Sequence, residues 1–227
     1  MEMVRHAVEE EQADVSHENS RGVFPLYLAA REGRTRILRY LVETARARVN
    51  QRTREDGRTA LLGACESGQL CAVEYLLTHA KADLRQTTVD GVSALYLACQ
   101  KGHVAVCQFL VERAGADVRC RSKDSEFFPL YGAAGGGHAE LVRYLVESCG
   151  ADVGQVTADG ASALFIACFK GHLQCARVLV ECAHADVHQS TTDGFFPLYI
   201  ASCIGHLHVV TSVASFSTFF SCLCFLL

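Results

Sequence analysis

Apolar and polar positions along this chain recur with a period of 34 or 35 residues. The repeat is marked by six leucines, each in a short apolar segment: Leu26, Leu61, Leu95, Leu130, Leu164 and Leu198. A second landmark follows each of the first five leucines by 23 residues: Val49, Leu84, Val118, Val153 and Val187. Self-similarity at such a period indicates stacked units, because one unit cannot bury its own apolar face.

The stretch from residue 90 to 123 shows what one repeat contains. A short apolar segment from Leu95 to Gln100 predicts a first helix, and Lys101-Gly102-His103 ends it, since glycine suits a tight reversal. Apolar residues spaced through 104–111 predict a second helix with one buried stripe. Gly115 then suits a left-handed helix cap, and the Asp-Gly pair of the connector suits a hairpin-like turn. One repeat is therefore two helices and a turn.

These repeats carry the motifs of a known family. The motifs are a turn glycine, a Pro-Leu step, a short helix ending in two small residues, a Gly-His pair and a Gly-Ala-Asp-Val segment. They occur here as Gly22, Phe24-Pro25-Leu26-Tyr27, Ala29-Ala30, Gly102-His103, Gly115-Ala116-Asp117-Val118, Gly137-His138, Gly150-Ala151-Asp152-Val153, Gly171-His172 and Ala185-Asp186-Val187. The sequence resembles an array of ankyrin repeats from about residue 3 to about residue 214.

The resemblance implies an all-α fold, an ankyrin-repeat α-solenoid that presents its turns and first helices to a protein partner. The sequence departs from the family where a histidine follows Pro-Leu. Those positions hold Tyr27, Leu62, Tyr96, Tyr131, Phe165 and Tyr199.

Aligning the copies predicts the domain organisation. Residues 1–20 match the second helix and turn of a repeat, and we expect them to act as an N-terminal cap. Repeats are expected at about 21–55, 56–89, 90–124, 125–158 and 159–192, with an incomplete repeat at 193–210. Residues 211–227 form an uncharged apolar tail that we expect to lie outside the native fold.

Three explanations of this tail stay open. A membrane anchor needs about 20 predominantly apolar residues, but six of the 19 residues from Val209 to Leu227 are Ser or Thr. A hydrophobic cap that folds back on the last repeat is the second. We favour the third, a translated non-coding segment, because Phe, Ser, Leu and Cys are the residues that thymine-rich DNA encodes.

Composition indicates a compartment and excludes some partners. The net charge of −4 argues against general attraction to nucleic acid, and no apolar secretory segment opens the chain. Several of the 12 cysteines occupy repeat positions that require a small buried residue, such as Cys65, Cys99 and Cys168. We therefore expect reduced thiols and an intracellular protein, in the cytoplasm or the nucleus.

Sequence motifs for phosphate binding, metal binding or catalysis are weak. The glycine cluster at 132–137 lacks the Gly-Lys-Ser/Thr of a phosphate loop, so we interpret it as a helix and turn built from small residues. His103, His138, His172 and His206 recur one repeat apart, too far apart for one metal ion. No nucleophile, base and orienting group can be nominated. We expect no catalytic, cofactor-binding or metal-binding residues, no small-molecule substrate, and no enzyme activity.

Candidate partner-binding residues come from two departures in the turns. Repeats one, four and six carry an aromatic residue and proline where the family has a hydroxyl: Val23-Phe24, Phe127-Phe128 and Phe195-Phe196. Such phenylalanines pack between adjacent turns or anchor a partner, since aromatic residues carry much of the energy of an interface. Turns 52–58 and 122–128 are each one residue longer, and insertions often lie on the binding face. The candidates are Arg54, Arg58, Lys123, Glu126, Phe127, Phe128, Phe195 and Phe196.

Charge is uneven, because residues 31–58 hold nine arginines against four acidic residues. Solvated helix faces explain this pattern, and an acidic partner peptide is the alternative. The sequence therefore predicts a non-catalytic module for binding a protein partner. The alternatives are a membrane-tethered adaptor held by the tail, or the recruiting segment of a larger multidomain enzyme or scaffold.

Overall fold

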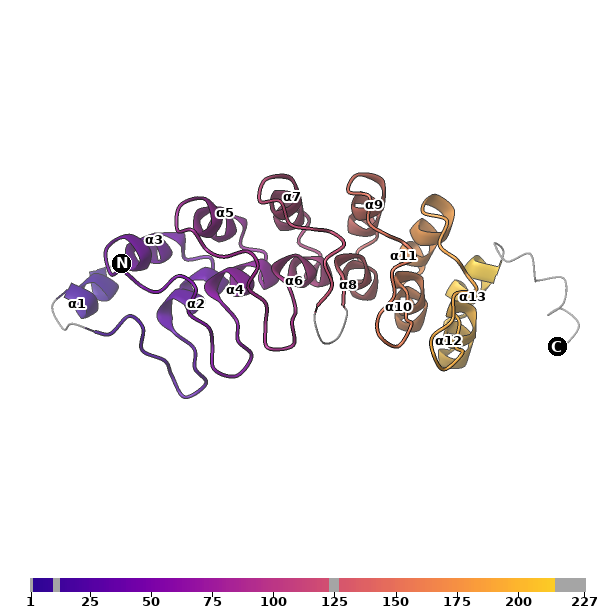
Figure 1. Ribbon diagram of the computed structural model, residues 1–227, viewed down its shortest axis with the longest axis horizontal. Helices are drawn as coiled ribbons and strands as arrows, with labels where there is room; N and C mark the ends of the chain where they lie inside the picture. The colour runs from indigo at the N-terminus through magenta and orange to yellow at the C-terminus, as the bar shows by residue number, and fades with distance from the viewer. Residues whose placement is uncertain (1, 10–12, 123–126, 215–227) are drawn as a thin grey trace, which may run out of the picture. The chain divides into compact units, whose positions relative to one another are not determined.

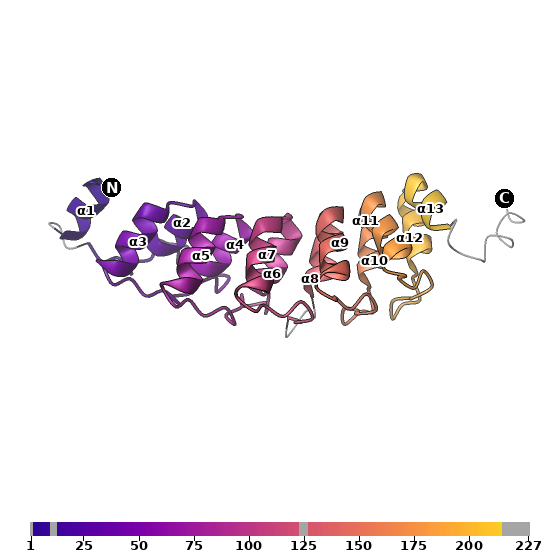
Figure 2. The ribbon, with the colours of Figure 1, turned by 90° about the horizontal axis from the view of Figure 1, so that it is seen from above.

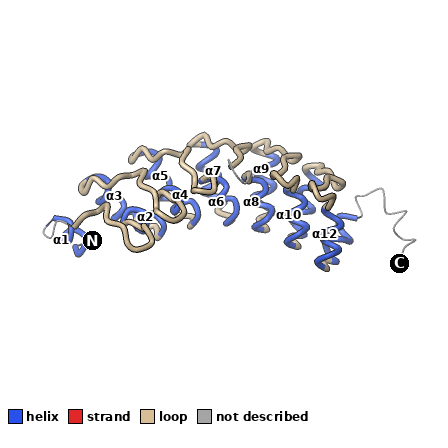
Figure 3. Tube along the Cα trace, turned by 60° about the horizontal axis from the view of Figure 1, so that its bottom comes forward, coloured by secondary structure: helices blue, strands red, loops and turns tan. Residues whose placement is uncertain are grey.

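The computed structural model describes residues 2–9, 13–122 and 127–214. The chain divides into two compact units, each described by itself. Unit 1 comprises Met1–Asp117 with Ser122–Asp124, and unit 2 comprises Val118–Arg121 with Ser125–Leu227. Across the described residues the secondary structure is helical, without a strand (Figure 3). The all-α repeat prediction is confirmed.

Unit 1 is built of two layers of helices (Figure 1). The first helices are α2 (Pro25–Arg31), α4 (Ala60–Glu66) and α6 (Ala94–Lys101), and α4 packs between the other two. The second helices are α3 (Thr35–Glu43), α5 (Leu70–Thr78) and α7 (Val104–Glu112), which form the other layer. Before them, α1 (Glu2–Glu9) occupies the place of a second helix, and Tyr40 donates a hydrogen bond to Glu9 Oε1 at 3.0 Å.

Unit 2 has the same arrangement (Figure 2). Its first helices are α8 (Pro129–Gly136), α10 (Ala163–Lys170) and α12 (Pro197–Ile204), with α10 in the middle. Its second helices are α9 (Ala139–Glu147), α11 (Leu173–Arg177) and α13 (Leu207–Ala214). Helix α11 continues into the π-helical turn η1 (Val178–Cys182), which the apolar pattern did not predict.

The end of the last repeat differs from the expected boundary. Helix α13 continues to Ala214, and Val213 and Ala214 are each 2% exposed. The helix of the last repeat therefore extends through residues 211–214, because the buried Val213 and Ala214 continue the stripe that begins at Val209. Residues 215–227, on which the three explanations of the tail depend, lie outside the described residues.

First helices begin in two ways. Where the sequence keeps a hydroxyl, the side chains of Thr59, Ser93 and Ser162 accept a hydrogen bond from the backbone N–H three residues later, at 3.1–3.3 Å. In α2, α8 and α12 the cap is a phenylalanine without such a bond, and proline follows it. Proline fits there because the first helical N–H has no intrahelical partner and the proline φ is already helical. Pairing phenylalanine with proline thus replaces the hydroxyl cap.

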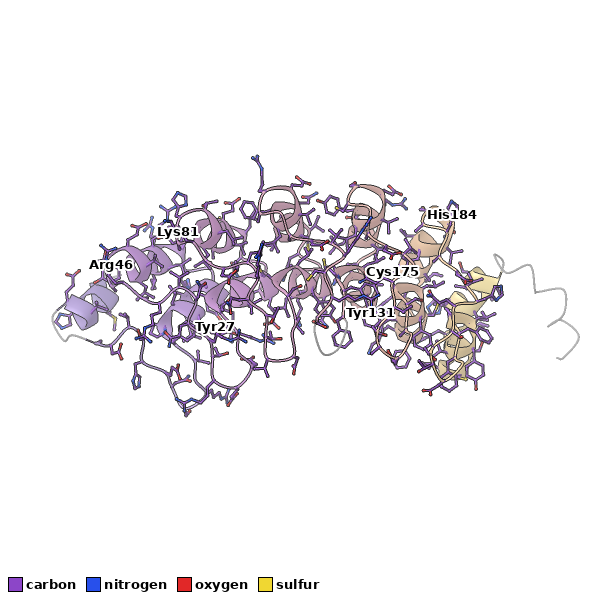
Figure 4. The ribbon with its side chains drawn as sticks, viewed as in Figure 1. Tyr27, Arg46, Lys81, Tyr131, Cys175 and His184 are labelled. Atoms are coloured by element: carbon purple, nitrogen blue, oxygen red, sulfur yellow. The ribbon has the colours of Figure 1, made fainter. Side chains whose placement is uncertain are left out.

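Three second helices are followed by a residue other than glycine in the left-handed conformation. Arg46, Lys81 and His184 have φ values of 56°, 56° and 54°, where the other repeats have Gly115 and Gly150 (Figure 4). A side chain makes this conformation costly, whereas a positive charge at a helix C-terminus is favourable. These positions carry local strain that glycine would remove.

Candidate protein-binding surface

Each first helix presents one line of residues spaced four apart. The line starts at the residue before the helix cap, and i, i+4 spacing keeps its members on one face. We call it the first-helix stripe. In unit 1 the stripes are Val23-Tyr27-Arg31, Arg58-Leu62-Glu66 and Val92-Tyr96-Gln100; in unit 2 they are Phe127-Tyr131-Gly135, Ala161-Phe165-Phe169 and Phe195-Tyr199-Cys203.

The stripes of unit 1 end in polar side chains that bond within the unit. Arg58 is paired with Glu66 at the far end of α4, and Gln100 Nε2 donates to the Tyr96 hydroxyl at 3.4 Å. The hydrogen bond that Arg31 donates to Tyr27 is the main cause that raises the pKa of Arg31. The middle residues of these stripes are buried, since Tyr27, Leu62 and Tyr96 are at most 6% exposed. The accessible far ends of these stripes are therefore polar.

The stripes of unit 2 are aromatic. The Phe127 ring stacks on Tyr131 with centroids 5.6 Å apart, and the Phe195 ring stacks on Tyr199 at 5.3 Å. On α10, the helix between α8 and α12, Phe169 is 38% exposed and Lys170 Nζ lies 5.3 Å from its ring centroid. These five aromatic residues (Phe127, Tyr131, Phe169, Phe195 and Tyr199) are called the aromatic surface.

Burial varies along the aromatic surface. Tyr131, labelled in Figure 4, is half-buried, and burial is the main reason that its pKa is raised, with the Asp159 carboxylate adding to it. Tyr199 is 44% exposed, and its hydrogen bond with Cys203 is the main cause that raises its pKa. Helix α8 carries only Gly135 and Gly136 at the far end of its stripe, and the Ile166 side chain packs against Gly135. The third position of the α8 stripe is therefore the small residue Gly135, covered on one side by Ile166.

The two predicted arginines lie in the turn of repeat two. The Arg54 side chain is 73% exposed, and its guanidinium pairs with Glu18 at 3.2 Å. Arg58 is more enclosed, at 24% exposed, and its Nε lies 2.6 Å from Asp56 Oδ2 without hydrogen-bond alignment. Arg58 thus ties its turn to α4, and Arg54 is the arginine that a partner could reach.

The four predicted phenylalanines fall into different environments. Phe128 is fully buried, which favours its interpretation as a packing residue. Phe127 is half-buried, and Phe195 and Phe196 are 40% and 37% exposed. Lys123 and Glu126 lie outside the described residues.

Sequence reasoning had not assigned Tyr131, Phe169 or Tyr199 to the candidate surface. Tyr131 and Tyr199 had been noted only as replacements of the family histidine. The signal that would have found them is the spacing of four from Phe127 and Phe195, which places each pair on one helix face. A binding residue must also be exposed, and the exposure of these side chains depends on how the neighbouring repeats pack against them.

The recurring histidines join neighbouring repeats. His103 Nε2 lies 2.9 Å from the carbonyl oxygen of Glu66, and His172 and His206 make the same contact with Gly135 and Phe169 at 3.2 Å. Within the described residues, no group of three or more His, Cys, Asp or Glu side chains could hold a metal ion. None of the described helices is both long and apolar enough to cross a membrane.

Stacked helix pairs with Gly-His turns define a helical repeat protein. The family model for ankyrin repeats, which holds three copies, matches residues 1–88, 47–124, 64–157 and 130–217. The chain therefore belongs to the ankyrin repeat family. Ankyrin repeats are generally modules for protein–protein interaction and are typically non-enzymatic.

Proposed function

We propose that this protein is a non-catalytic module that binds a protein partner through the aromatic surface of unit 2. The observation that carries the proposal is the exposure of Phe169, Phe195 and Tyr199 at 38%, 40% and 44% on one set of stripes. Large exposed aromatic groups gathered on one face favour an interaction site. The partner segment that fits these exposed rings is apolar.

The stacked pairs favour binding for a second reason. A ring held by its neighbour loses little conformational freedom when a partner covers it, so more of the gain from burial remains as affinity. Full burial of one phenylalanine contributes about 1.5–3 kcal/mol, and interface energy is concentrated in such residues. Phe169 lies on α10, the helix that packs between those carrying the two stacked pairs, and is the residue that we expect to contribute most.

Site-specific cross-linking tests this surface. A photoreactive phenylalanine analogue at position 169 should cross-link a defined partner in cell extract, and the same analogue at Val89 should not, although Val89 is 61% exposed. Introducing Phe127→Ser into the chain with the analogue at 169 should remove the cross-link. An identical partner spectrum from positions 169 and 89, or one unaffected by Phe127→Ser, would count against the aromatic surface.

The turn of residues 52–58 is a second candidate surface. Arg54 is the observation that favours it, since its guanidinium is mostly exposed and Glu18 is its acid partner. The chemistry fits an acidic partner peptide, whose binding should weaken as salt rises. Arg54→Glu should abolish that salt dependence, and Glu18→Gln should strengthen binding. Binding that does not change with salt would eliminate this candidate.

The proposed setting is intracellular, with no catalysis by the repeats themselves. One alternative is a membrane-tethered adaptor. Membrane fractionation of cells that express the chain with and without residues 215–227 would distinguish it from the proposed module. The other alternative is a recruiting segment within a larger enzyme or scaffold, which longer transcripts would reveal.

A further inference from the structure

The outer face of α3 in unit 1 is strongly basic. Residues 33–54 hold seven arginines and one acidic residue, Glu43. Helix α3 packs its apolar face into the unit, so Arg36 and Arg39, three residues apart, lie together on its exposed face. Arg46 follows the helix and is also exposed (Figure 4). We call Arg36, Arg39 and Arg46 the basic surface.

The cations of the basic surface are available to a partner. Within the described part of the chain, none of the three arginines forms an ion pair. Arg39 lies 5.3 Å from the ring centroid of Tyr75, a contact that does not neutralise its charge. Glu43, the acid between Arg39 and Arg46, accepts a hydrogen bond from the Tyr75 hydroxyl at 3.0 Å. The basic surface therefore carries positive charge that its own neighbours leave unpaired.

A pocket adjoins the basic surface at Arg39, among α3, α5 and α7. Its volume is about 330 Å³, and its walls include Cys71, Glu74, Tyr75 and Phe109. Cys71 is exposed, and Glu74 and Phe109 are half-buried. A pocket at the lower end of the range for ligand sites is large enough for a single large side chain.

The pocket lies where a link between second helices is missing. Tyr40 and Tyr75 each donate a hydrogen bond at 3.0 Å to a glutamate on the preceding second helix. At the next step Phe109 takes the place of the tyrosine and Thr78 that of the glutamate, so the same link cannot form. Both residues line the pocket, and the Thr78 hydroxyl donates to the carbonyl oxygen of Glu74 at 2.6 Å.

The pocket and the basic surface together indicate the chemistry of one partner. The rings and the Glu74 carboxylate favour a neutral apolar side chain in the pocket, since a second carboxylate there would repel Glu74. Acidic residues that flank this side chain complement the arginines. Nucleic acid fits less well, because Arg39 and the stacked His79 ring, 5.6 Å away, already contact the Tyr75 ring on which a base would stack.

We propose that this face of unit 1 docks an acidic segment of a partner protein. Aspartate and glutamate side chains of the segment pair with Arg36, Arg39 and Arg46, and one apolar side chain enters the pocket beside Phe109. The docking site uses the second helices, so it is separate from the aromatic surface and from the turn of residues 52–58.

The probe is a short fluorescent peptide with one central leucine, flanked on both sides by aspartate and glutamate. Its fluorescence anisotropy should show saturable binding to the full chain in low salt, and binding should weaken as salt rises. The double charge reversal Arg36→Glu with Arg39→Glu should weaken binding at least about tenfold. Arg21→Glu, a matched change at an exposed arginine of the same unit, should leave it nearly unchanged. Thermal unfolding checks that each variant is folded.

A second pair of measurements tests the pocket. A peptide with alanine in place of the leucine should bind the native chain about fivefold more weakly, because it buries less apolar surface. Cys71→Trp places a large ring in the pocket from an exposed position, so the leucine and alanine peptides should then bind equally.

Several results would overturn this assignment. They are no saturable binding in low salt, undiminished binding by the double charge reversal, or equal binding of the leucine and alanine peptides to the native chain. Tighter binding of single-stranded DNA or of phosphatidylserine vesicles than of the peptide, at the same salt, would also overturn it. The partner would then be a nucleic acid or a membrane surface.

Discussion

Units 1 and 2 share one backbone plan and differ in what their first helices present. In unit 1 the stripe of α4 is closed by the ion pair of Arg58 with Glu66, while in unit 2 the stripe of α8 is closed by the stack of Phe127 on Tyr131. The core positions are alike, since Leu61 and Leu130 are 2% and 1% exposed. The repeat therefore separates two kinds of position: core residues hold the stack in both units, and stripe residues differ between the units.

The largest effect should follow from removing a buried ring, because the cores of both units depend on one. Phe24→Ala in unit 1 and Phe128→Ala in unit 2 should each lower the free energy of unfolding by about 3–5 kcal/mol. Phe196→Ala should cost far less, since that ring is 37% exposed. Urea denaturation measures all three. A similar loss in the free energy of unfolding for Phe128→Ala and Phe196→Ala would contradict the expectation that the buried ring contributes more to stability than the exposed one.

Loss of the ion pair between Arg58 and Glu66 in unit 1 should lower the free energy of unfolding by less than loss of a buried ring. It should lower it by more than loss of a fully exposed ion pair. Arg58→Ala leaves Asp56 and Glu66 without their shared cation, and we expect a loss of about 1–2 kcal/mol. The loss should shrink in high salt, because screening weakens the pair. The control is Phe169→Ala in unit 2, whose smaller effect on stability should not vary with salt. Equal salt sensitivity of both variants would contradict the contrast between the units.

The left-handed cations of unit 1 offer a gain in stability. Arg46→Gly and Lys81→Gly should each stabilise the protein by about 0.5–1 kcal/mol, because glycine adopts φ near 56° without steric cost. In unit 2, Gly150→Arg should destabilise it by a similar amount. Thermal unfolding detects shifts of this size. Destabilisation by both glycine variants would mean that the helix-terminal charge outweighs the strain.

The smallest expected effect is a dependence on pH in unit 1. Burial, assisted by the Lys101 charge, lowers the pKa of His103 below its ordinary value of 6.5. The unfolded chain then binds more protons than the folded one, so this contribution is complete above pH 6.5 and is lost as pH falls through the folded pKa. Urea denaturation at pH 7.5 and 5.5 should show a smaller difference for His103→Gln than for the native chain. If the difference in stability between pH 7.5 and 5.5 is the same in His103→Gln as in the native chain, His103 does not cause the pH dependence.

Much of the fold could be predicted from the sequence because the pattern is local and repeated. The helix expected near residues 104–111 is Val104–Glu112, and the first helix expected at Leu95–Gln100 is Ala94–Lys101. Period, glycine turns and apolar stripes are sufficient for such assignments. The π-helical turn Val178–Cys182 could not be predicted this way, since it changes the hydrogen-bond register without changing the apolar pattern.

The candidate surface could be predicted only in part. Phenylalanine at the helix cap was visible in three repeats, but its role depends on what packs against it. Phe128 and Phe196 have the same neighbours in sequence, each following phenylalanine and preceding Pro-Leu-Tyr, yet one is buried and the other 37% exposed. Arg58 likewise forms an ion pair within its own repeat, because Glu66 lies eight residues later on the same stripe.

The sequence by itself determined the period, the helix pairs, the hydroxyl and proline helix starts and the family, because each follows from interactions within one repeat. Only the tertiary structure decided which rings are covered and which arginine is tied to its own turn. The neighbouring repeat sets the first property, and the packing of a turn on the helix of its own repeat sets the second. The exposure of a side chain is a property of the stack, and the same local sequence serves as core or as surface according to whether a neighbour lies against it.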